Sequence, residues 1–323
     1  MSRLTVIIPT YRRSVSLMRA LASLEEQDIP IELIVVDNAA DIVLRTALNS
    51  FNEDARHPVR WIPEPRLGLH YARNTGATHA TCELLAYVDD DATFAPGWAR
   101  TYVEGFAAHP EMVAAGGPSH PAWECPPPAW LLALVARRPM FFQLSLRDMG
   151  PDASFDETES FWGLNMAIRR SALLAAGGFN PELVGDESVG DGEGGLFRKL
   201  RATGARVGYL PGALVHHHIP AHRMTVRYLR WRMKNEGRSE AFALVRRDRA
   251  SSRAALARMF VKNIMLAGLV ELSVTPVRWS RRVFPLRLRM LAAERTGRAM
   301  YAWRALADDE LRRQLLEDDW MVR

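Results

Sequence analysis

The stretch "ELLAYVDDDATFAPGW" (83–98) joins an apolar run to three consecutive aspartates, Asp89, Asp90 and Asp91. The run Leu84–Val88 is continuously apolar rather than alternating, which predicts a strand buried on both faces. Adjacent carboxylates raise one another's pKa unless a positive charge neutralises them. A divalent cation would do so, because Mg²⁺ and Mn²⁺ prefer oxygen ligands and are often shared between carboxylates and substrate phosphates. The alternative is a solvated loop whose carboxylates cap the next helix.

Similar apolar runs precede this strand, and helical patterns lie between them. The strand patterns are "LTVIIP" (4–9), "IELIVVDNA" (31–39) and "VRWIPEP" (59–65), and the helical patterns cover 16–27 and 68–80. This alternation predicts a doubly wound α/β fold with a mostly parallel sheet. In such sheets ligands bind beyond the carboxyl ends of the strands. We therefore expect the polar groups at 10–13, 37–38, 64–66 and 89–91 to meet in one crevice.

The second half of the chain changes character twice. "PSHPAWECPPPAW" (118–130) opens a segment to about residue 160 that is rich in proline and aromatic residues, which predicts a loop or lid. A strand and a helix are predicted over 162–179, a glycine-rich loop opening a short helix over 190–204, and two strands over 205–218. From about residue 222 the pattern is helical and basic. We expect an α/β domain over 1–221 and a basic helical extension over 222–323.

Charge is divided unevenly along the chain. Residues 221–323 hold 23 Lys and Arg against 11 Asp and Glu, a net charge of +12, whereas residues 1–220 hold 19 against 26, a net charge of −7. The basic amphipathic stretch 222–262 indicates either an anionic membrane surface or packing on the α/β domain or on another subunit of a homo-oligomer. The acidic body weighs against a nucleic-acid binder.

Cysteine content and apolar patterning bear on the compartment. The sequence has two cysteines, Cys82 and Cys125, in no metal-binding spacing, and no signal-peptide pattern at residues 1–10. No apolar run reaches the ~20 residues that a spanning helix needs. These features predict a cytoplasmic protein, with the inner face of the membrane as a peripheral location.

Isolated polar residues near the strand ends each have two interpretations. Asp37 either binds a nucleoside or caps a helix, and Arg66 either binds phosphate or lies on the surface. Glu193, among glycines in "DGEGGLFRKL", is either a general base or a capping carboxylate. In "HHH" (216–218) the side chains should alternate between the two faces of a strand, so at most two can point into a site.

Together these stretches resemble family 2 glycosyltransferases of the GT-A fold over residues 4–239. The matching stretches, in order, are "VIIPTYRR", "LIVVDN", "RLGLHYARNTG", "AYVDDDATFAPGW", "GLNMAIRR", "GGFNPEL", "GEGGLFRKLRATG" and "YLPGALVHHHIPAHR". The resemblance implies a nucleotide-sugar-binding half over 1–100 and an acceptor-binding half over 101–221. It also implies a role for each matching residue.

The resemblance implies metal ligation by Asp91 and His217 and acceptor contacts from Trp162 and Asn165. Glu193 would be the catalytic base, with Asp191 as the fallback, because relatives usually have two adjacent acids where this chain has Gly192 and Glu193. The residues implied to bind the donor are Pro9, Thr10, Tyr11, Arg13, Asp37, Asn38, Arg66, Asp89, Asp90 and Arg223.

The implied reaction is an inverting transfer of a sugar from a UDP-, TDP- or GDP-type donor to a hydroxyl acceptor, with Mn²⁺ or Mg²⁺ as cofactor. Polysaccharide or glycoconjugate biosynthesis, with an acceptor that can be lipid-linked, is the favoured setting, and glycosylation of a small natural product is the alternative. A nucleotidyltransferase on a related fold is a further alternative. Such enzymes usually carry a glycine-rich loop after the first strand, and "PTYRRS" (9–14) contains no glycine.

Overall fold

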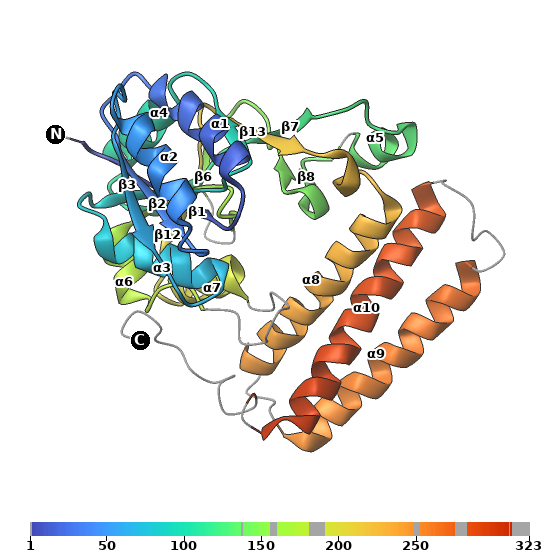
Figure 1. The fold of residues 1–323 in the computed structure, drawn as a ribbon. Coiled ribbons are helices and arrows are strands. Elements are labelled where there is room, and N and C mark those ends of the chain that lie inside the picture. Colours follow the sequence, from blue (N-terminus) through green and yellow to red (C-terminus); the bar gives the residue numbers. More distant parts are fainter. Residues whose placement is uncertain are drawn as a thin grey trace.

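The four strands expected in the N-terminal half lie side by side and run parallel. They are β1 (Thr5–Thr10), β2 (Glu32–Asp37), β3 (Val59–Pro63) and β4 (Leu84–Val88), in the order β4-β1-β2-β3. Every residue of β1 and β4 is buried, which explains their continuous apolar character. The structure is a computed structural model that describes residues 2–136, 138–155, 160–180, 191–247, 252–274, 283–309 and 311. The predicted α/β fold is confirmed (Figure 1).

Four further strands extend this sheet to the order β10-β12-β6-β11-β4-β1-β2-β3. They are β6 (Met112–Gly116), β10 (Ser154–Phe155), β11 (Asn165–Arg169) and β12 (Arg206–Tyr209). Strand β11 runs antiparallel to both of its neighbours, β4 and β6, so the sheet is mixed beyond β4. The antiparallel strand brings the segment that precedes it to the carboxyl end of β4.

Helices cover both faces of the sheet. On one face α1 (Ser14–Glu25), α2 (Ile42–Asn52) and α4 (Trp98–Ala108) bury their apolar side chains in one core cluster. The helices on the other face, which pack in a second cluster, are α3 (Leu69–His79), α6 (Arg170–Ala175) and α7 (Gly192–Ala202). The sheet therefore places its strand ends between two helical layers, as the doubly wound pattern requires.

The proline-rich segment does not form the predicted loop. It contains β7 (Ser119–Trp123) and α5 (Ala129–Val135), and β7 joins a second sheet of order β5-β13-β7-β9-β8. The other strands are β5 (Ala92–Phe94), β8 (Met140–Phe141), β9 (Leu146–Arg147) and β13 (Val215–Ile219). Strand β9 pairs with β7 only at Ser119 in the described segments, so Pro121 lies beside a largely open edge, where proline is tolerated. Two short 3₁₀ helices, η1 (Phe142–Leu144) and η2 (Ala221–Arg223), flank this sheet.

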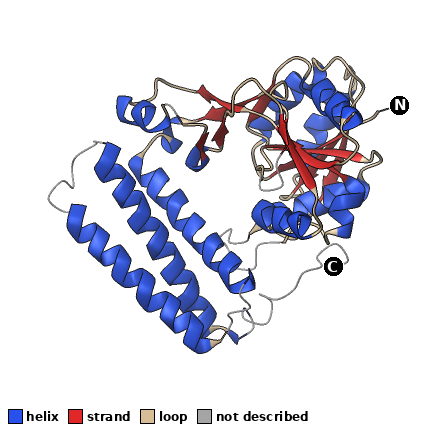
Figure 2. Ribbon diagram, turned by 180° about the vertical axis from the view of Figure 1, so that it is seen from behind, coloured by secondary structure: helices blue, strands red, loops and turns tan. Residues whose placement is uncertain are grey.

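The C-terminal region folds as three long helices, α8 (Val226–Arg247), α9 (Arg253–Val274) and α10 (Val283–Ala307). Helix α10 packs between α8 and α9, and α8 lies nearest the α/β domain (Figures 1 and 2). At Gly237 and Gly297 an added Cβ would collide with a backbone oxygen of the opposite helix, so α8 and α10 touch backbone to backbone. The basic stretch 222–262 is divided between α8 and α9. In the described part of the chain, no helix is both long and apolar enough to span a bilayer.

Candidate active site

The three aspartates lie where the two sheets meet. They follow β4 of the large sheet and precede β5 of the small sheet, which pairs with β13. The backbone N–H of His218 donates a hydrogen bond of 2.9 Å to the carbonyl oxygen of Asp91. This contact holds the aspartate segment against β13, the strand that carries the histidine run.

Asp91 is buried and surrounded by cationic side chains. Arg13 lies 2.6 Å from its carboxylate and Arg223 lies 3.0 Å away. Burial alone would raise the pKa of Asp91. However, the neighbouring His217, Arg223 and Arg13 hold this pKa well below its usual range. The carboxylate is therefore ionised at neutral pH, as a metal ligand must be.

His217 points into the site, and the two flanking histidines do not share its face. Burial alternates along β13, with His217 buried and His216 and His218 half-buried, as predicted for a strand. The Nδ1 of His217 lies 2.8 Å from the carbonyl oxygen of Leu144, to which it must donate. Its Nε2 lies 3.6 Å from the Asp91 carboxylate and 3.0 Å from Arg223, from which it can accept a hydrogen bond in the neutral tautomer.

Asp90 and Thr10 are buried against each other. The Thr10 hydroxyl donates to Asp90 at 2.7 Å, and Arg13 forms an ion pair with the same carboxylate at 2.7 Å. Burial raises the pKa of Asp90 to about 7, although Arg13 and Thr10 oppose that rise. These contacts fix the β1 loop to the β4 loop and leave Arg13 bridging Asp90 and Asp91.

The ends of β2 and β3 lie at the same edge of the sheet as the end of β1. Asn38 donates to the carbonyl oxygens of Glu64 and Arg66 and accepts from the N–H of Gly68, so it holds the loop before α3. The guanidinium of Arg66 is held by Glu64 at 2.9 Å and lies over the ring of Tyr71. Arg66 and Tyr11 are partly exposed on this edge, whereas Pro9 is buried within β1.

The base contact predicted for Asp37 is contradicted by its burial. Asp37 has no exposed surface, and its carboxylate accepts from the N–H groups of Ala39 and Asp41 and from the Trp61 indole. The carboxylate thus caps the loop after β2, which was the alternative interpretation.

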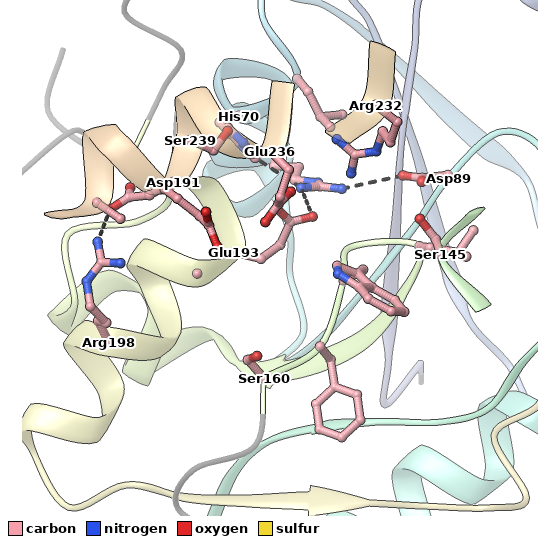
Figure 3. Close-up of a pocket in the computed structure, with 18 residues that line it drawn as sticks. His70, Asp89, Ser145, Ser160, Asp191, Glu193, Arg198, Arg232, Glu236 and Ser239 are labelled. Atoms are coloured by element: carbon pink, nitrogen blue, oxygen red, sulfur yellow. Dashed lines mark hydrogen bonds and ion pairs between the residues drawn. The ribbon is translucent and has the colours of Figure 1, made fainter. Parts of the chain in front are cut away.

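A cavity of about 490 Å³ lies beside the aspartate segment (Figure 3). Its lining comes from α3, α7 and α8 and from the connecting segments at Asp89, Ser145 and 160–164. The lining residues are Leu69, His70, Arg73, Asp89, Ser145, Ser160, Phe161, Trp162, Leu164, Asp191, Glu193, Gly194, Arg198, Arg232, Glu236, Ser239, Glu240 and Ala243. Of the predicted site residues, the cavity gathers Asp89, Trp162, Glu193 and Asp191.

One buried arginine joins Asp89 to Glu193. Arg73 lies 2.8 Å from the Glu193 carboxylate and 3.4 Å from that of Asp89, and is itself 1% exposed. The N–H of Gly163 donates to the same Glu193 oxygen at 2.9 Å. A Cβ on Gly163 would collide with the Arg73 guanidinium, so only glycine leaves room for this arrangement.

These contacts set the ionisation of Glu193. Burial would raise the pKa of Glu193. Arg73 overcomes this effect and holds the pKa well below the usual range, with help from the Gly163 N–H. The neighbouring His70 is fully buried beside Arg73, and both effects lower the pKa of His70 to about 4. At neutral pH the cavity therefore presents an ionised Glu193 next to a neutral histidine.

Asp191 and Asn165 are both engaged elsewhere. Asp191 accepts from Asn180 and is paired with Arg198. The acceptor contact predicted for Asn165 is wrong, because its buried amide bonds to the Trp98 indole, the Tyr102 hydroxyl and the carbonyls of two neighbouring loops. Asn165 cross-links the core beneath the site and has no group left for a ligand.

Two groups of residues that complete the cavity, Arg73 and the α8 side chains, have no predicted role there. The order "GLHYARNTG" contained a usable signal for Arg73, because position 73 faces inward one turn after His70 in α3. No local pattern places α8 beside α7.

Comparison with known families decides the identity. Residues 5–173, just over half of the chain, match the family described as Glycosyl transferase family 2. The chain belongs to this glycosyltransferase family. It is therefore a sugar-transferring enzyme, and the nucleotidyltransferase alternative does not hold.

Relatives of the glycosyltransferase have named roles. It is 27% identical to Glucosyl-dolichyl phosphate glucuronosyltransferase of Haloferax volcanii, over 83% of this chain and 85% of that protein. It is 24% identical to Succinoglycan biosynthesis protein ExoM of Rhizobium meliloti, over 80% of this chain and 78% of that protein. Both relatives extend well into the C-terminal region.

Solved structures share the fold of the glycosyltransferase. The mannosyltransferase PcManGT from Pyrobaculum calidifontis, in complex with GDP-Man and Mn²⁺, matches with a TM-score of 0.56 and 20% identity, over 91% of this chain and 86% of that chain. GalNAc-T7 with UDP, GalNAc and Mn²⁺ matches with a TM-score of 0.50 and 19% identity, over 71% of this chain and 47% of that chain. At these identities the likeness shows the fold.

Proposed function

We propose that the enzyme moves a sugar from a nucleoside-diphosphate sugar to an acceptor hydroxyl, with inversion at the anomeric carbon. The observation that carries this proposal is the position of Arg73, which contacts Asp89 on the aspartate segment and Glu193 across the cavity. Asp89, which lies on the side proposed to bind the donor, and Glu193, the candidate base, thus line the same cavity. Such an arrangement suits direct displacement, in which no covalent intermediate is required.

Glu193 is the general base of the proposal. Its carboxylate is ionised, half-buried and directed into the cavity, where it can accept the proton of an attacking hydroxyl (Figure 3). Arg73 and Gly163 fix its orientation through one oxygen, Oε1. The second oxygen remains for the acceptor.

The donor diphosphate would lie over the aspartate segment. Arg13 and Arg223 flank Asp91 there, and guanidinium groups match phosphate oxygens in charge and geometry. Tyr11 and Arg66, on the exposed edge of the same crevice, would meet the nucleoside. Thr10 and Asp90 would act indirectly, by holding Arg13 and the β1 loop.

Asp91 and His217 fit a divalent cation. A carboxylate oxygen and an imidazole lone pair face each other, and the Leu144 carbonyl fixes the histidine tautomer, as outer-shell groups do for metal-binding histidines. No cluster of three or more potential ligand side chains occurs among the described residues, so substrate phosphates would complete the coordination. Bound Mn²⁺ or Mg²⁺ would neutralise charge on the departing diphosphate.

We place the reaction in polysaccharide or glycoconjugate biosynthesis, with a lipid-linked acceptor as the favoured case. The support is the naming of two relatives that match over about four fifths of this chain, one for a dolichyl phosphate substrate and one for succinoglycan biosynthesis.

The experiment that tests the function is a donor screen. With Mn²⁺ present, we expect one of UDP-, TDP- and GDP-linked sugars to raise the melting temperature and to be hydrolysed slowly, with the released or transferred sugar in the inverted configuration by NMR. Binding of oligonucleotides in place of every nucleotide sugar, or retention of configuration, would contradict the proposal.

We also propose that α9 lies on an anionic membrane surface. Six large apolar side chains on its outward face are 36–72% exposed: Val261, Ile264, Met265, Leu266, Leu269 and Leu272. A soluble helix rarely exposes such a stripe. The exposed Arg258 and Lys262 lie beside it, and residues 221–323 carry +12, which complements anionic lipid rather than a second copy of this basic region.

Replacing Met265 and Leu269 with glutamate should abolish flotation with vesicles containing phosphatidylglycerol. Each loses about 1.5–3 kcal/mol of apolar burial in the bilayer interface, so binding should weaken more than tenfold. The control is Val43→Glu, an exposed apolar position on α2. Equal flotation of both variants, or a wild-type dimer in sedimentation that α9 variants dissociate, would overturn the membrane assignment.

A further inference from the structure

One face of α8 turns polar side chains into the catalytic cavity. Arg232, Glu236, Ser239, Glu240 and Ala243 all line it, and their spacing of four, three, one and three residues is that of a single helical face. Figure 3 shows Arg232, Glu236 and Ser239 pointing down from this helix toward the cavity that also holds Glu193 and Asp89. The C-terminal region thus forms a wall of the site.

Among the residues that the structure describes, three of these side chains lack a direct hydrogen-bond or ion-pair partner, although the charge of Arg232 attracts the Glu236 carboxylate. Within the described part of the chain, Arg232, Glu236 and Ser239 make no hydrogen bond or ion pair, whereas Glu240 is paired with Arg298. All three are half-buried, and polar groups that lack direct partners in a concave site are available to a ligand. Burial raises the pKa of Glu236, although the nearby Arg232 opposes that rise.

The position of α8 is fixed by its other side. Gly237 and Gly297 let α8 and α10 pack in backbone contact, and Arg298 reaches from α10 to Glu240. On the same helix Leu229 and Met233 are buried in a core cluster shared with α5 and α10. The polar face is therefore held in place before any ligand arrives, which reduces the entropic cost of binding.

The charges of the cavity select the class of ligand. Its lining holds five carboxylates against three arginines, and His70 is neutral. A second phosphate would be repelled by this net negative charge, whereas hydroxyl groups can donate to carboxylates without an electrostatic cost. Trp162 adds an aromatic surface to the same lining, on which the apolar face of a sugar ring can pack.

We propose that the polar face of α8, with Glu236 at its centre, forms the acceptor subsite for an uncharged sugar ring, which it holds against Glu193. The inference rests on the proposed sugar transfer and specifies its acceptor end. Glu236 is a binding and orienting group here: it holds acceptor hydroxyls and leaves the proton to Glu193. The acceptor sugar is neutral at the point of attack, and any phosphate on a lipid carrier lies outside the cavity.

The test measures acceptor binding separately from donor chemistry. Saturation-transfer NMR with a panel of neutral p-nitrophenyl pyranosides, and of the matching pyranoside 6-phosphates, reports binding to the wild type and to Glu236→Gln. At least one neutral glycoside should bind the wild type more tightly than its phosphate. Glu236→Gln should weaken that binding about tenfold or more, the effect of losing a charged hydrogen-bond partner. A wild type that binds none of the panel, or prefers the phosphates, overturns the proposal.

Kinetics and controls separate this role from others. In Glu236→Gln the acceptor KM should rise about tenfold while kcat and acceptor-independent donor hydrolysis stay near wild-type values. A fall in kcat at unchanged KM would make Glu236 part of the chemistry and overturn the binding role.

Glu271→Gln, the same change on the outer helix α9, should alter neither value. Ala243→Phe, which narrows the same cavity, should weaken acceptor binding. If the wild type hydrolyses no donor, the sugar transfer fails instead, whatever the panel shows.

Discussion

Replacing Glu193 with glutamine should lower kcat by about 10²–10⁴-fold while the donor dissociation constant changes little. Glutamine keeps the size of the side chain and an oxygen that can accept from Arg73 and the Gly163 N–H, so the local geometry is retained. It cannot take a proton at neutral pH. Rapid-mix kinetics with saturating donor and acceptor, together with calorimetric titration of the donor product nucleotide, measure the two quantities.

The matching substitution Asp191→Asn separates the two candidate bases. Asp191 is already paired with Arg198 and accepts from Asn180, so it has less freedom to reach an acceptor proton. We expect its kcat to fall much less than that of Glu193→Gln. If the order of effects is reversed, Asp191 is the base. If kcat stays near the wild-type value in both variants, neither residue acts as a general base.

Local sequence was sufficient to predict the strand ends and their position at one edge of the sheet. Continuous apolar runs identify buried parallel strands, and parallel strands present their carboxyl ends at one edge. The run at Leu84–Val88 and the three aspartates after it are therefore where they were expected. The alternation along β13 likewise put His217 on the side facing Asp91.

The predictions failed where a polar residue could serve either the ligand or the fold. Asp37 and Asn165 both sit at strand ends near the crevice, yet one caps a loop and the other cross-links core elements. Their residue types and positions suit both uses. Only their neighbours, which are up to 67 residues away in sequence for Asn165, determine which use applies.

Long-range packing also explains what the sequence could not reveal about the cavity. Arg73 and Glu193 are 120 residues apart, and neither segment encodes the other's position. The basic stretch 222–262, which includes α8, was expected either to meet a membrane surface or to pack on the α/β domain or another subunit, and neither alternative predicted a polar face that lines the cavity. This face meets the cavity because close packing at Gly237 and Gly297 fixes the orientation of α8. A segment rich in proline can also form a strand where one edge is open, as β7 does.

The second large effect is expected at Asp91. Asp91→Asn should reduce Mn²⁺ affinity in the presence of the nucleoside diphosphate and lower kcat/KM by at least about 10²-fold, because charge at the leaving group is then poorly stabilised. Asparagine preserves the size and one oxygen but removes the negative charge that Arg13, Arg223 and His217 surround. Electron paramagnetic resonance titration of Mn²⁺ gives the affinity independently of activity.

Asp90→Asn is the matched control for this charge change, because the Asp90 carboxylate is held by Thr10 and Arg13 and, unlike that of Asp91, forms no ion pair with His217 among the described residues. It should leave Mn²⁺ affinity within a few-fold of the wild type, even where donor binding weakens through Arg13. Equal loss of Mn²⁺ in both variants would mean that the aspartate run acts only through its summed charge. Full activity of the wild type after EDTA treatment would show that the reaction needs no divalent cation. Asp91 would then serve to hold Arg13 and Arg223 for the diphosphate.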